Sequence, residues 1–566
     1  MVFGRKMKKI LNWKLLLLLV FLFGSFLRVY QLGSIPSGFH ADEAAFGYNA
    51  YSLLHTARDE YGKLLPIVLK SFGDYKGALY AYLDVPFVAL LGLTPFAERL
   101  PSAIFGSLSI FLVYFITEKL LKNKKISLFS ALVFSLSPWA INITRTTGDV
   151  AIALFFALLM VYSLVELQNK FSKLWFLVSL LSAFLAVISY APYRIYVVFL
   201  PLIFLIISIR KIKGRLKFDK RSFSVLVTVL AIGILYTVVA SVARFNQISI
   251  FSNPQTELIM QEQIREDQFT PVLITRIFHN KIVNYSRTIL ENTGQYFTFD
   301  YLFLNGGYPQ RERIPDTGLF YIWEAPFLLI GLYAILRNKK RNEILLLLWW
   351  SLLLLPTVIT FDEIPNVHRN LIILPPIAII IGIGIYELVN YRLFRNTKFL
   401  ILLSFLILIV SSYELLYFEH QYFVHNDLHH PWYRGYAYKE LVTDLKKYYP
   451  NYKKIIVTKA QSSPYIYILF YSKYSPQKYQ KEGSPRDLNY TGFDKYYFVP
   501  QDCPLTEGKT GEVIGEQGIL YVDSGNCVVP KHNVKLLDKV SWQDGASAFK
   551  LMEFVATGTA QLKAGF

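Results

Sequence analysis

The chain has 566 residues, of which 53% are hydrophobic and only 17% are charged, and its mean hydropathy is +0.35. This composition excludes a single soluble domain and indicates a membrane protein that crosses the bilayer several times. The formal net charge of +19 could suggest nucleic-acid binding, but the cations occur in short segments between apolar runs, where the positive-inside rule places them.

The first apolar segment covers residues 11–30, after the basic sequence MVFGRKMKK. Such a beginning is typical of a signal peptide, but no small-x-small cleavage site follows, and the apolar run is long enough to cross the membrane. We therefore expect an uncleaved first span whose basic end lies in the cytoplasm.

An adjacent pair of acids, Asp42 and Glu43, follows within the sequence SIPSGFHADEAAFGYNAYSLLHTARDEYG, residues 34–62. Acid pairs in exposed loops are usually only solvated. Here the pair lies shortly after a span, so a carboxylate could face a lipid headgroup and act as a general base on an incoming hydroxyl. We predict an outer catalytic loop over residues 31–100.

The segment YKGALYAYLDVPFVALLGL, residues 75–93, is apolar but carries Lys76, Asp84 and Pro86. If it crossed the membrane, every later loop would change sides. Without it, the main basic loops lie on the side of the N-terminus, as the positive-inside rule requires; they cover residues 122–125, 166–173, 210–221, 337–342 and 391–398. We therefore predict that residues 75–93 form an amphipathic or juxtamembrane helix on the outer membrane surface.

Further apolar segments approach the roughly 20 residues that a span requires. They cover residues 101–120, 126–144, 149–166, 172–190, 193–209, 222–243, 317–336, 343–360, 369–390 and 397–416. The prediction is thus eleven spans, with the N-terminus inside and the C-terminus outside. The acid-bearing loop and the long loop 244–316 then open on the outer face, together with most other polar turns, as an outward-facing active site would require.

The turn TRTTGDV, residues 144–150, contains Arg145 and Asp149. Asp149 opens an apolar helix, where an acid also caps the helix and suits its dipole, so a catalytic and a capping role are both open. Arg145 lies at the outer end of the preceding span, where a charge is expected to face a cavity, an acid or a lipid phosphate.

Four other cations, Lys76, Arg194, His368 and Arg369, lie at outer helix ends. Snorkelling to the interface explains many such residues in membrane proteins. Cations that converge on one face would also bind a phosphate leaving group, for which the bidentate geometry of arginine is suited. We predict that these four residues bind substrate.

Residues 417–566 are polar and aromatic and predict a small α/β domain outside the membrane. Helices are expected at YKELVTDLKKYY and SPYIYILFYSKY, and strands at KKIIVT, KYYFVP, GILYVD and AFKLMEF. The region holds both cysteines of the chain, Cys503 and Cys527, which could form a disulfide or stay reduced.

The sequence contains no P-loop, zinc-protease or serine-hydrolase motif. The energy for a reaction must then come from an activated substrate. On the outer face, where nucleotides are scarce, the natural donor is a lipid-linked one.

The order of these features resembles glycosyltransferase family 39, whose GT-C enzymes include protein O-mannosyltransferases and lipid A aminoarabinose transferases. The resemblance covers residues 11–390 and is strongest over 38–166. It rests on the sequence ADEAAFGYNAYSLL, on the segment from DYKGALYAYL to RLPSA and beyond, and on SALVFSLSPWAINITRTTGDV.

By this resemblance, the acid of the family's first loop falls on Asp42, with Glu43 beside it. The family's lysine before the juxtamembrane helix falls on Lys76, although GAL replaces the usual prolines after it. The acid that opens the fourth span falls on Asp149, and an HR pair before a late span matches His368 and Arg369.

The family implies transfer of a sugar from a polyprenyl-phosphate donor to an extracytoplasmic acceptor, with inversion through an oxocarbenium-like state. Asp42 would be the general base, and Lys or Arg side chains would stabilise the departing lipid phosphate. Some relatives hold a divalent metal with such acids and others are metal-independent, so metal dependence is left open.

We therefore expect a multi-pass cell-membrane protein of the cell envelope with a GT-C-like transmembrane domain over residues 1–416 and an extracytoplasmic α/β domain over 417–566. Its partners would be the lipid-linked donor, the bilayer and a protein, lipid or glycan acceptor. The main alternative is a transporter or flippase of lipid-linked glycans, although transporters tend to place ionisable residues near the membrane midplane. A receptor or anchor for the C-terminal domain and an oligosaccharide polymerase are further alternatives.

Overall fold

The computed structural model describes residues 12–146, 148–169, 172–215, 247–390, 397–429, 431–482, 490–507 and 512–555. The chain forms two compact units. Unit 1 consists of Met1–Tyr30 and Ser102–Gln421, and unit 2 of Gln31–Pro101 and Tyr422–Phe566. Each unit is therefore built from two separate stretches of the chain. The predicted span 222–243 lies outside the described residues.

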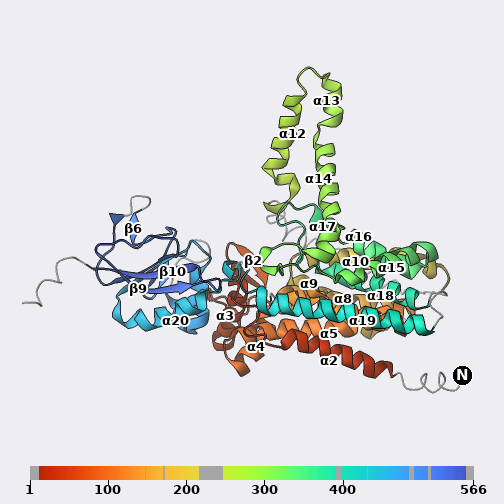
Figure 1. Ribbon diagram of the computed structural model, residues 1–566, viewed down its shortest axis with the longest axis horizontal. Coiled ribbons are helices and arrows are strands. Elements are labelled where there is room, and N and C mark those ends of the chain that lie inside the picture. The colour runs from red at the N-terminus through yellow and green to blue at the C-terminus, as the bar shows by residue number, and fades with distance from the viewer. Residues whose placement is uncertain are drawn as a thin grey trace, which may run out of the picture. The chain divides into compact units, whose positions relative to one another are not determined.

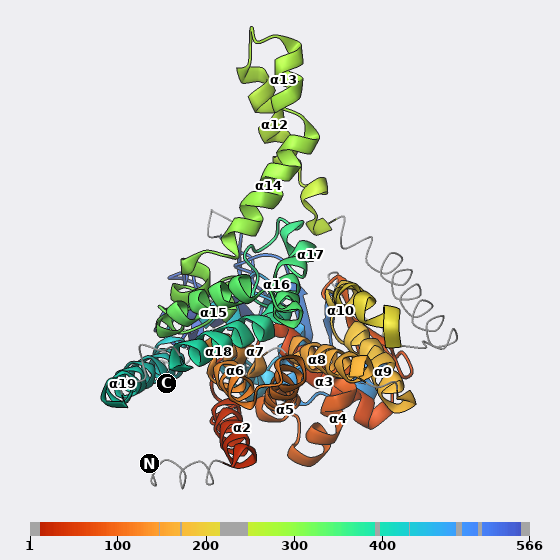
Figure 2. The same ribbon diagram turned by 90° about the vertical axis from the view of Figure 1, so that its right-hand side faces the viewer.

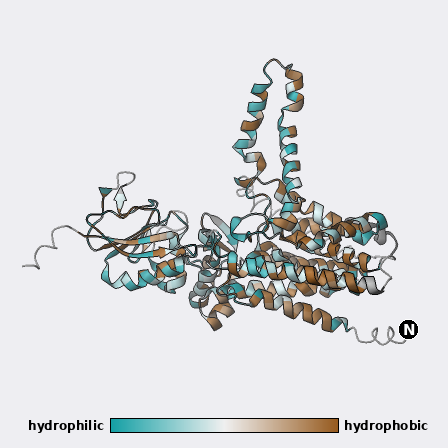
Figure 3. Cartoon of the chain, viewed as in Figure 1, coloured by the Kyte–Doolittle hydropathy of each residue, from teal (hydrophilic) through white to brown (hydrophobic). Residues whose placement is uncertain are grey.

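Unit 1 is a bundle of apolar helices that run alongside one another (Figures 1 and 2), and hydrophobic residues occupy most of their length (Figure 3). Its bundle helices are α2 (Trp13–Val29), most of α5 (Pro95–Leu121), α6 (Lys124–Leu136), α7 (Pro138–Thr144), α8 (Gly148–Asn169), α9 (Lys173–Ser189), α10 (Tyr193–Arg215), α15 (Ala325–Asn338), α16 (Arg341–Leu352), α17 (Leu355–Val358), α18 (Leu374–Asn390) and α19 (Thr397–His420).

Within the described residues, five helical segments are long and apolar enough to cross a membrane: Pro95–Leu121, Gly148–Gln168, Arg341–Val358, Leu371–Asn390 and Ile401–His425. A sixth arises if α6 and α7, which are bent by 55° at the break between them, count as one span. The chain is thus a multi-pass helical membrane protein, as predicted. The total of eleven spans stays a prediction.

Local sequence determines where several of these helices begin. The side chain of Asn123 accepts hydrogen bonds from the first N–H groups of α6, and Ser137 does the same for α7. The break between α6 and α7 has a simple cause, since Pro138 has no N–H to continue the helix and suits the first position of a new one. After the bend, α7 leads to Arg145 at its end and then to Asp149 in the first turn of α8.

Part of the predicted long loop 244–316 is helical. After the short helix η1 (Ile250–Ser252), the chain forms a hairpin of α12 (Pro254–Glu266), α13 (Val272–Phe278) and α14 (Lys281–Gln295), which projects from the bundle of unit 1 (Figures 1 and 2). The short helices η2 (Asp300–Leu304) and η3 (Gln310–Glu312) then lead back to α15.

The first stretch of unit 2 contains α3 (Ala41–Thr56), β1 (Val68–Ser71), β2 (Asp74–Gly77) and α4 (Leu79–Leu91). The helix predicted over residues 75–93 is therefore wrong at its start, because residues 74–77 pair with β1 as an antiparallel strand. The cause is the two-residue turn of Phe72 and Gly73, which both have positive φ values, of 50° and 81°.

The second stretch of unit 2 carries a six-stranded sheet with the order β4-β5-β3-β8-β10-β9. Its strands are β4 (Gly492–Phe493), β5 (Tyr496–Val499), β3 (Lys454–Thr458), β8 (Ile519–Ser524), β10 (Ser547–Phe554) and β9 (Val534–Ser541), and a separate pair is formed by β6 (Thr506–Glu507) and β7 (Glu512–Val513). The helices are α20 (Tyr438–Tyr448), α21 (Pro464–Ser472) and α22 (Pro476–Lys481).

Every helix and strand predicted in this stretch has a counterpart in the structure, whereas α22 and the strands β4, β6, β7 and β9 were not predicted. Half-exposed and exposed residues dominate β9, which lies at the sheet edge and lacks the alternation of a half-buried strand. The extracytoplasmic location of this region and a domain boundary between residues 416 and 417 stay predictions.

Candidate functional site

The predicted acid pair lies at the N-terminus of α3, in a capping box. Nδ1 of His40 accepts a hydrogen bond from the Asp42 backbone N–H at 3.3 Å, and Oε2 of Glu43 accepts one from the His40 N–H at 2.8 Å. This reciprocal pairing determines the first turn of the helix, and the helix dipole favours negative charge there. The two adjacent acids nevertheless have different partners.

Asp42 forms an ion pair with Lys76, and the two side chains are 24% and 18% exposed. Lys76 lies on β2, where the β1–β2 hairpin holds it, and its Nζ lies 5.6 Å from the ring centre of Phe46 and 5.3 Å from that of Phe72. Aromatic faces attract a cation in this range. The hairpin thus holds a positioned ammonium beside a carboxylate that still reaches solvent.

Glu43 has a buried partner instead. Its Oε1 lies 2.8 Å from Nε of Arg99, and both side chains are only 1% exposed. Arg99 also donates hydrogen bonds of 2.8 to 3.2 Å to the carbonyl oxygens of Leu32, Pro36 and Gly38. The Glu43–Arg99 pair therefore ties the chain before α3 in place, and this geometry is that of a positioning pair.

Helix α21 packs against α3 within unit 2. A Cβ atom at Gly47 would lie 2.6 Å from the ring of Phe470, so glycine is what allows this close approach. Phe470 also packs on Phe39, two residues before the acids' helix, with ring centres 4.6 Å apart. Residues from both stretches of unit 2 therefore pack around the start of the helix that bears the acid pair.

In unit 1, Arg145 ends α7 and is fully buried. Its Nη1 donates to the carbonyl of Leu27 at 2.6 Å, in the last turn of α2, where unpaired carbonyls and the helix dipole favour a cation. Arg145 thus has a structural contact, and its predicted contact with a lipid phosphate stays a prediction.

Two segments that are far apart in the sequence meet at Glu312, on η3. The Glu312 side chain is 1% exposed; it accepts a hydrogen bond from Thr146 at 3.2 Å and lies 3.5 Å from Nε2 of His368. Its backbone carbonyl accepts a bond of 2.7 Å from Asn142. A small recess, lined in part by Trp139, Asn142 and Glu312, adjoins this cluster.

The other predicted residues of unit 1 lie at helix ends. Asp149 is in the first turn of α8, where its Oδ1 accepts the N–H of Val150 at 2.9 Å. Arg369 pairs with Asp362 at 2.8 Å, just before the short helix η5 (Leu371–Ile373). Arg194 is half-buried in the first turn of α10.

Sequence reasoning missed two residues of these clusters. Arg99 opens the segment RLPSA. An arginine at the start of an apolar helix could have indicated a buried acid as its partner. Glu312 lies on the three-residue helix η3, in a segment without hydrophobic periodicity, so nothing in the local sequence connects it with Thr146 and His368.

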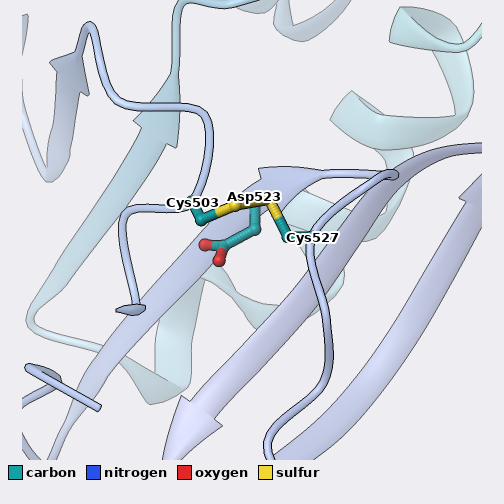
Figure 4. Close-up of side chains that lie close together, drawn as sticks. All are labelled: Cys503, Asp523 and Cys527. Carbon is teal, nitrogen blue, oxygen red and sulfur yellow. A yellow bond between two sulfur atoms is a disulfide. The ribbon is translucent and has the colours of Figure 1, made fainter. Parts of the chain in front are cut away.

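One group of three side chains in the described part of the chain has the spacing of a metal site: Cys503, Asp523 and Cys527 (Figure 4). The two cysteines form a disulfide, with Cα atoms 5.7 Å apart. Disulfide sulfurs are not the thiolates that bind metals, so this group is not a metal site. The open question about the two cysteines is thereby answered in favour of the bond.

The acid pair also lacks the ligands for a metal. In the described ranges, Asp42 and Glu43 belong to no group of three ligand side chains, and cations already engage both carboxylates. The residues present do not fit a divalent ion.

Asp523 is buried beside the disulfide. Burial raises the pKa of this carboxyl from 3.8 to about 7, against the opposite effects of the Leu505 N–H, which donates to it at 3.3 Å, and of the Lys550 charge. A carboxyl in this state binds a proton near neutral pH.

Residues 76–240 match the family model described as dolichyl-phosphate-mannose-protein mannosyltransferase. The match confirms the resemblance predicted from the sequence. It begins at Lys76 and includes Arg99, so Asp42 and Glu43 lie before the matched range. No curated protein sequence matches the chain.

The chain shares its fold with ArnT from Cupriavidus metallidurans bound to undecaprenyl phosphate, at a TM-score of 0.51 and 11% identity over 95% of this chain and 98% of that one. It is also similar to the archaeal oligosaccharyltransferase AglB from Archaeoglobus fulgidus in complex with an inhibitory peptide and a dolichol-phosphate, at a TM-score of 0.46 and 13% identity. That match covers 81% of this chain, which spans 63% of the AglB chain. At these identities the likeness concerns the fold alone.

Proposed function

We propose that this protein is a membrane glycosyltransferase that moves a sugar from a polyprenyl-phosphate-linked donor to an extracytoplasmic acceptor, which is a protein, a lipid or a glycan. The family match over residues 76–240 and the fold shared with ArnT support this class of reaction. Undecaprenyl phosphate, which ArnT binds in that structure, is a polyprenyl phosphate of the kind that would carry the donor sugar.

The pairing of Asp42 with Lys76 is the observation that carries the proposal. A partly exposed carboxylate can take the proton of an acceptor hydroxyl or amine, and the neighbouring ammonium can pair with phosphate oxygens. Base and phosphate-binding cation thus lie side by side, as a donor whose leaving group is a lipid phosphate requires.

In the proposed step, the acceptor oxygen or nitrogen bonds to the anomeric carbon while the bond from that carbon to the phosphate oxygen breaks. Asp42 takes the acceptor proton, the electron pair leaves with the lipid phosphate, and the configuration inverts. Lys76 stabilises the charge on the phosphate. Asp149 is proposed as a further catalytic residue, and Arg145, Arg194, His368 and Arg369 as further substrate-binding residues.

Glu43 acts differently from Asp42 in this proposal. Its buried pairing with Arg99 supports a positioning role, in which it holds the first turn of α3 and hence the Asp42 carboxylate in place. Removing Glu43 would therefore act through Asp42 and not on the substrate.

We further propose eleven spans, a cytoplasmic N-terminus and an extracytoplasmic domain over residues 417–566. The disulfide between Cys503 and Cys527 supports this side assignment, because disulfides persist in oxidising compartments outside the cytoplasm. The proposed partners are the donor lipid and an acceptor on the same side of the membrane.

Sugar transfer by the purified protein in liposomes tests this function. A panel of polyprenyl-phosphate monosaccharides is offered together with a mixed membrane extract as acceptor. We expect one donor to be consumed, and Asp42→Asn to lower the rate by about 100-fold or more, as for loss of a general base. Glu262→Gln, which changes an exposed acid on α12, serves as the matched control and should keep full activity.

Full activity of Asp42→Asn would remove Asp42 from the role of base. If no donor is consumed but labelled lipid-linked sugar changes leaflets, the protein is a transporter or flippase and the glycosyltransferase proposal is wrong.

A further inference from the structure

The hairpin of residues 254–295 carries an apolar surface that the proposed reaction does not use. None of the residues of α13 is buried, and Phe269, just before it, is 97% exposed. Leu273 and Ile282 are 72% and 79% exposed. Val272, Ile274, Ile277, Phe278 and Val283 are also exposed. A contiguous patch of this kind marks a contact with a membrane or with another protein.

The charges of the hairpin favour a membrane. From residue 268 to residue 290 the sequence contains Arg276, Lys281 and Arg287 but no Asp or Glu. The acids instead lie on α12 and at its end, as Glu257, Glu262, Glu266 and Asp267, with one more, Glu291, near the end of α14. Apolar side chains interspersed with bases are typical of helices that lie among anionic lipid headgroups.

The base of the hairpin is held at the end of a candidate span, Arg341–Val358. Ile250 donates its N–H to the Ile359 carbonyl at 3.0 Å, and Phe361 donates to the Ile248 carbonyl at 2.9 Å. The side chain of Asn292 donates to the carbonyls of Val358 and Thr360 at 2.8 and 3.1 Å. If Arg341–Val358 crosses the bilayer, both ends of the hairpin lie where this span reaches the membrane surface.

From this base the hairpin runs across the direction of the bundle helices, as both views show (Figures 1 and 2). In Figure 1, α13 and α14 form the right-hand side of the hairpin, and the bundle helices extend to the right from its base. Helix α14 alone carries it about 22 Å, from its 15 residues at a rise of 1.5 Å each. A hairpin with this start and this direction stays at headgroup depth along its length.

We propose that residues 254–295 lie on the membrane surface, with Phe269 and the apolar residues of α13 inserted among the lipids. Arg276 and Lys281 then contact the phosphates of anionic lipids. Lys281 lies 3.8 Å from Glu257, with both side chains more than half exposed, so this pairing leaves it within reach of a headgroup. The chain thereby has a membrane contact separate from its spans, whatever reaction it catalyses.

Site-specific fluorescence in nanodiscs tests this contact on the full-length protein. Both cysteines of the chain are joined in a disulfide, so a single introduced cysteine can be labelled without reduction. An environment-sensitive dye is attached at Leu273→Cys and, as the matched control, at Glu262→Cys on the acidic helix α12. Each is exposed to a lipid-borne nitroxide quencher and to aqueous iodide, in neutral and in partly anionic bilayers.

We expect the dye at position 273 to be quenched severalfold more by the lipid-borne nitroxide, and severalfold less by iodide, than the dye at position 262. The combined change of Arg276→Glu and Lys281→Glu should reduce this difference in anionic bilayers. Equal iodide access at the two positions would overturn the proposal. So would shielding of position 273 that appears only when a membrane protein extract is added, because the patch would then belong to a protein partner.

Discussion

The two adjacent acids of α3 have opposite environments because their side chains leave the helix in different directions. Asp42 reaches solvent and meets Lys76, whereas Glu43 turns inward to Arg99. Their adjacency in the sequence made both acids candidates for catalysis. Their partners come from different elements, since Lys76 lies on β2 and Arg99 on α5. The buried ion pair with Arg99 supports the positioning role that we propose for Glu43, and its catalytic role stays a prediction.

Replacing Arg99 with Met should destabilise the protein strongly. The change leaves the Glu43 carboxylate buried without its cation, which costs about 3–5 kcal/mol. Thermal unfolding of the purified protein measures this, and a double-mutant cycle with Glu43→Gln isolates the pair. We expect the double variant to lose less stability than the two single variants lose in sum. Strictly additive losses would show that the ion pair contributes nothing.

Asp523 should make stability depend on pH. Its pKa in the folded protein is raised to about 7, so the stability it contributes is fully present below its unfolded value near 3.8 and is lost as the pH rises through 7. The unfolding temperature of the wild type should therefore fall relative to that of Asp523→Asn between pH 4 and pH 8. Parallel curves for the two proteins would contradict the raised pKa.

Secondary structure followed the local sequence closely where apolar runs are long. The segments predicted at 101–120, 149–166 and 172–190 correspond to α5, α8 and α9. The main error was at residues 75–93, where a turn with two positive φ values converts the expected helix start into a strand. That turn presents Lys76 to Asp42, and the proposed function depends on this pair.

The turn between β1 and β2 should tolerate asparagine at position 73 but not valine. Gly73 has a φ of 81°, which a β-branched side chain avoids and asparagine adopts more readily. Gly73→Val should thus displace Lys76 and reduce sugar transfer, whereas Gly73→Asn should retain most of it. The liposome assay compares the two, and equal activity would show that the hairpin does not position Lys76.

Unit 2 joins stretches that are more than 300 residues apart in the sequence, residues 31–101 and 422–566. Within it, Gly47 of α3 receives Phe470 of α21, so the helix that bears the acid pair depends on the C-terminal stretch for its packing. The C-terminal stretch is therefore expected to support the acid pair and not only to carry an independent activity.

Truncation after residue 421 should loosen residues 31–101. Loss of α21 exposes Phe39 and the face of α3 around Gly47, so limited proteolysis followed by mass spectrometry should find new cleavage between α3 and β1. Phe470→Ala in the full-length chain should produce the same cleavage more weakly, which separates packing from the effect of truncation. Unchanged protection in both variants would contradict the dependence.

Features carried by contiguous sequence could be predicted without a structure: the apolar runs of the spans, the acid pair after the first of them, and the strands β3, β5, β8 and β10 of the C-terminal stretch. These follow from hydrophobic burial and periodicity, which act over neighbouring residues. The Glu43–Arg99 pair, the meeting of Thr146 and His368 at Glu312, and the joining of residues 31–101 with 422–566 required the tertiary structure. Such contacts depend on how distant segments pack, and burial of a charge is decided only by the partners that packing brings to it.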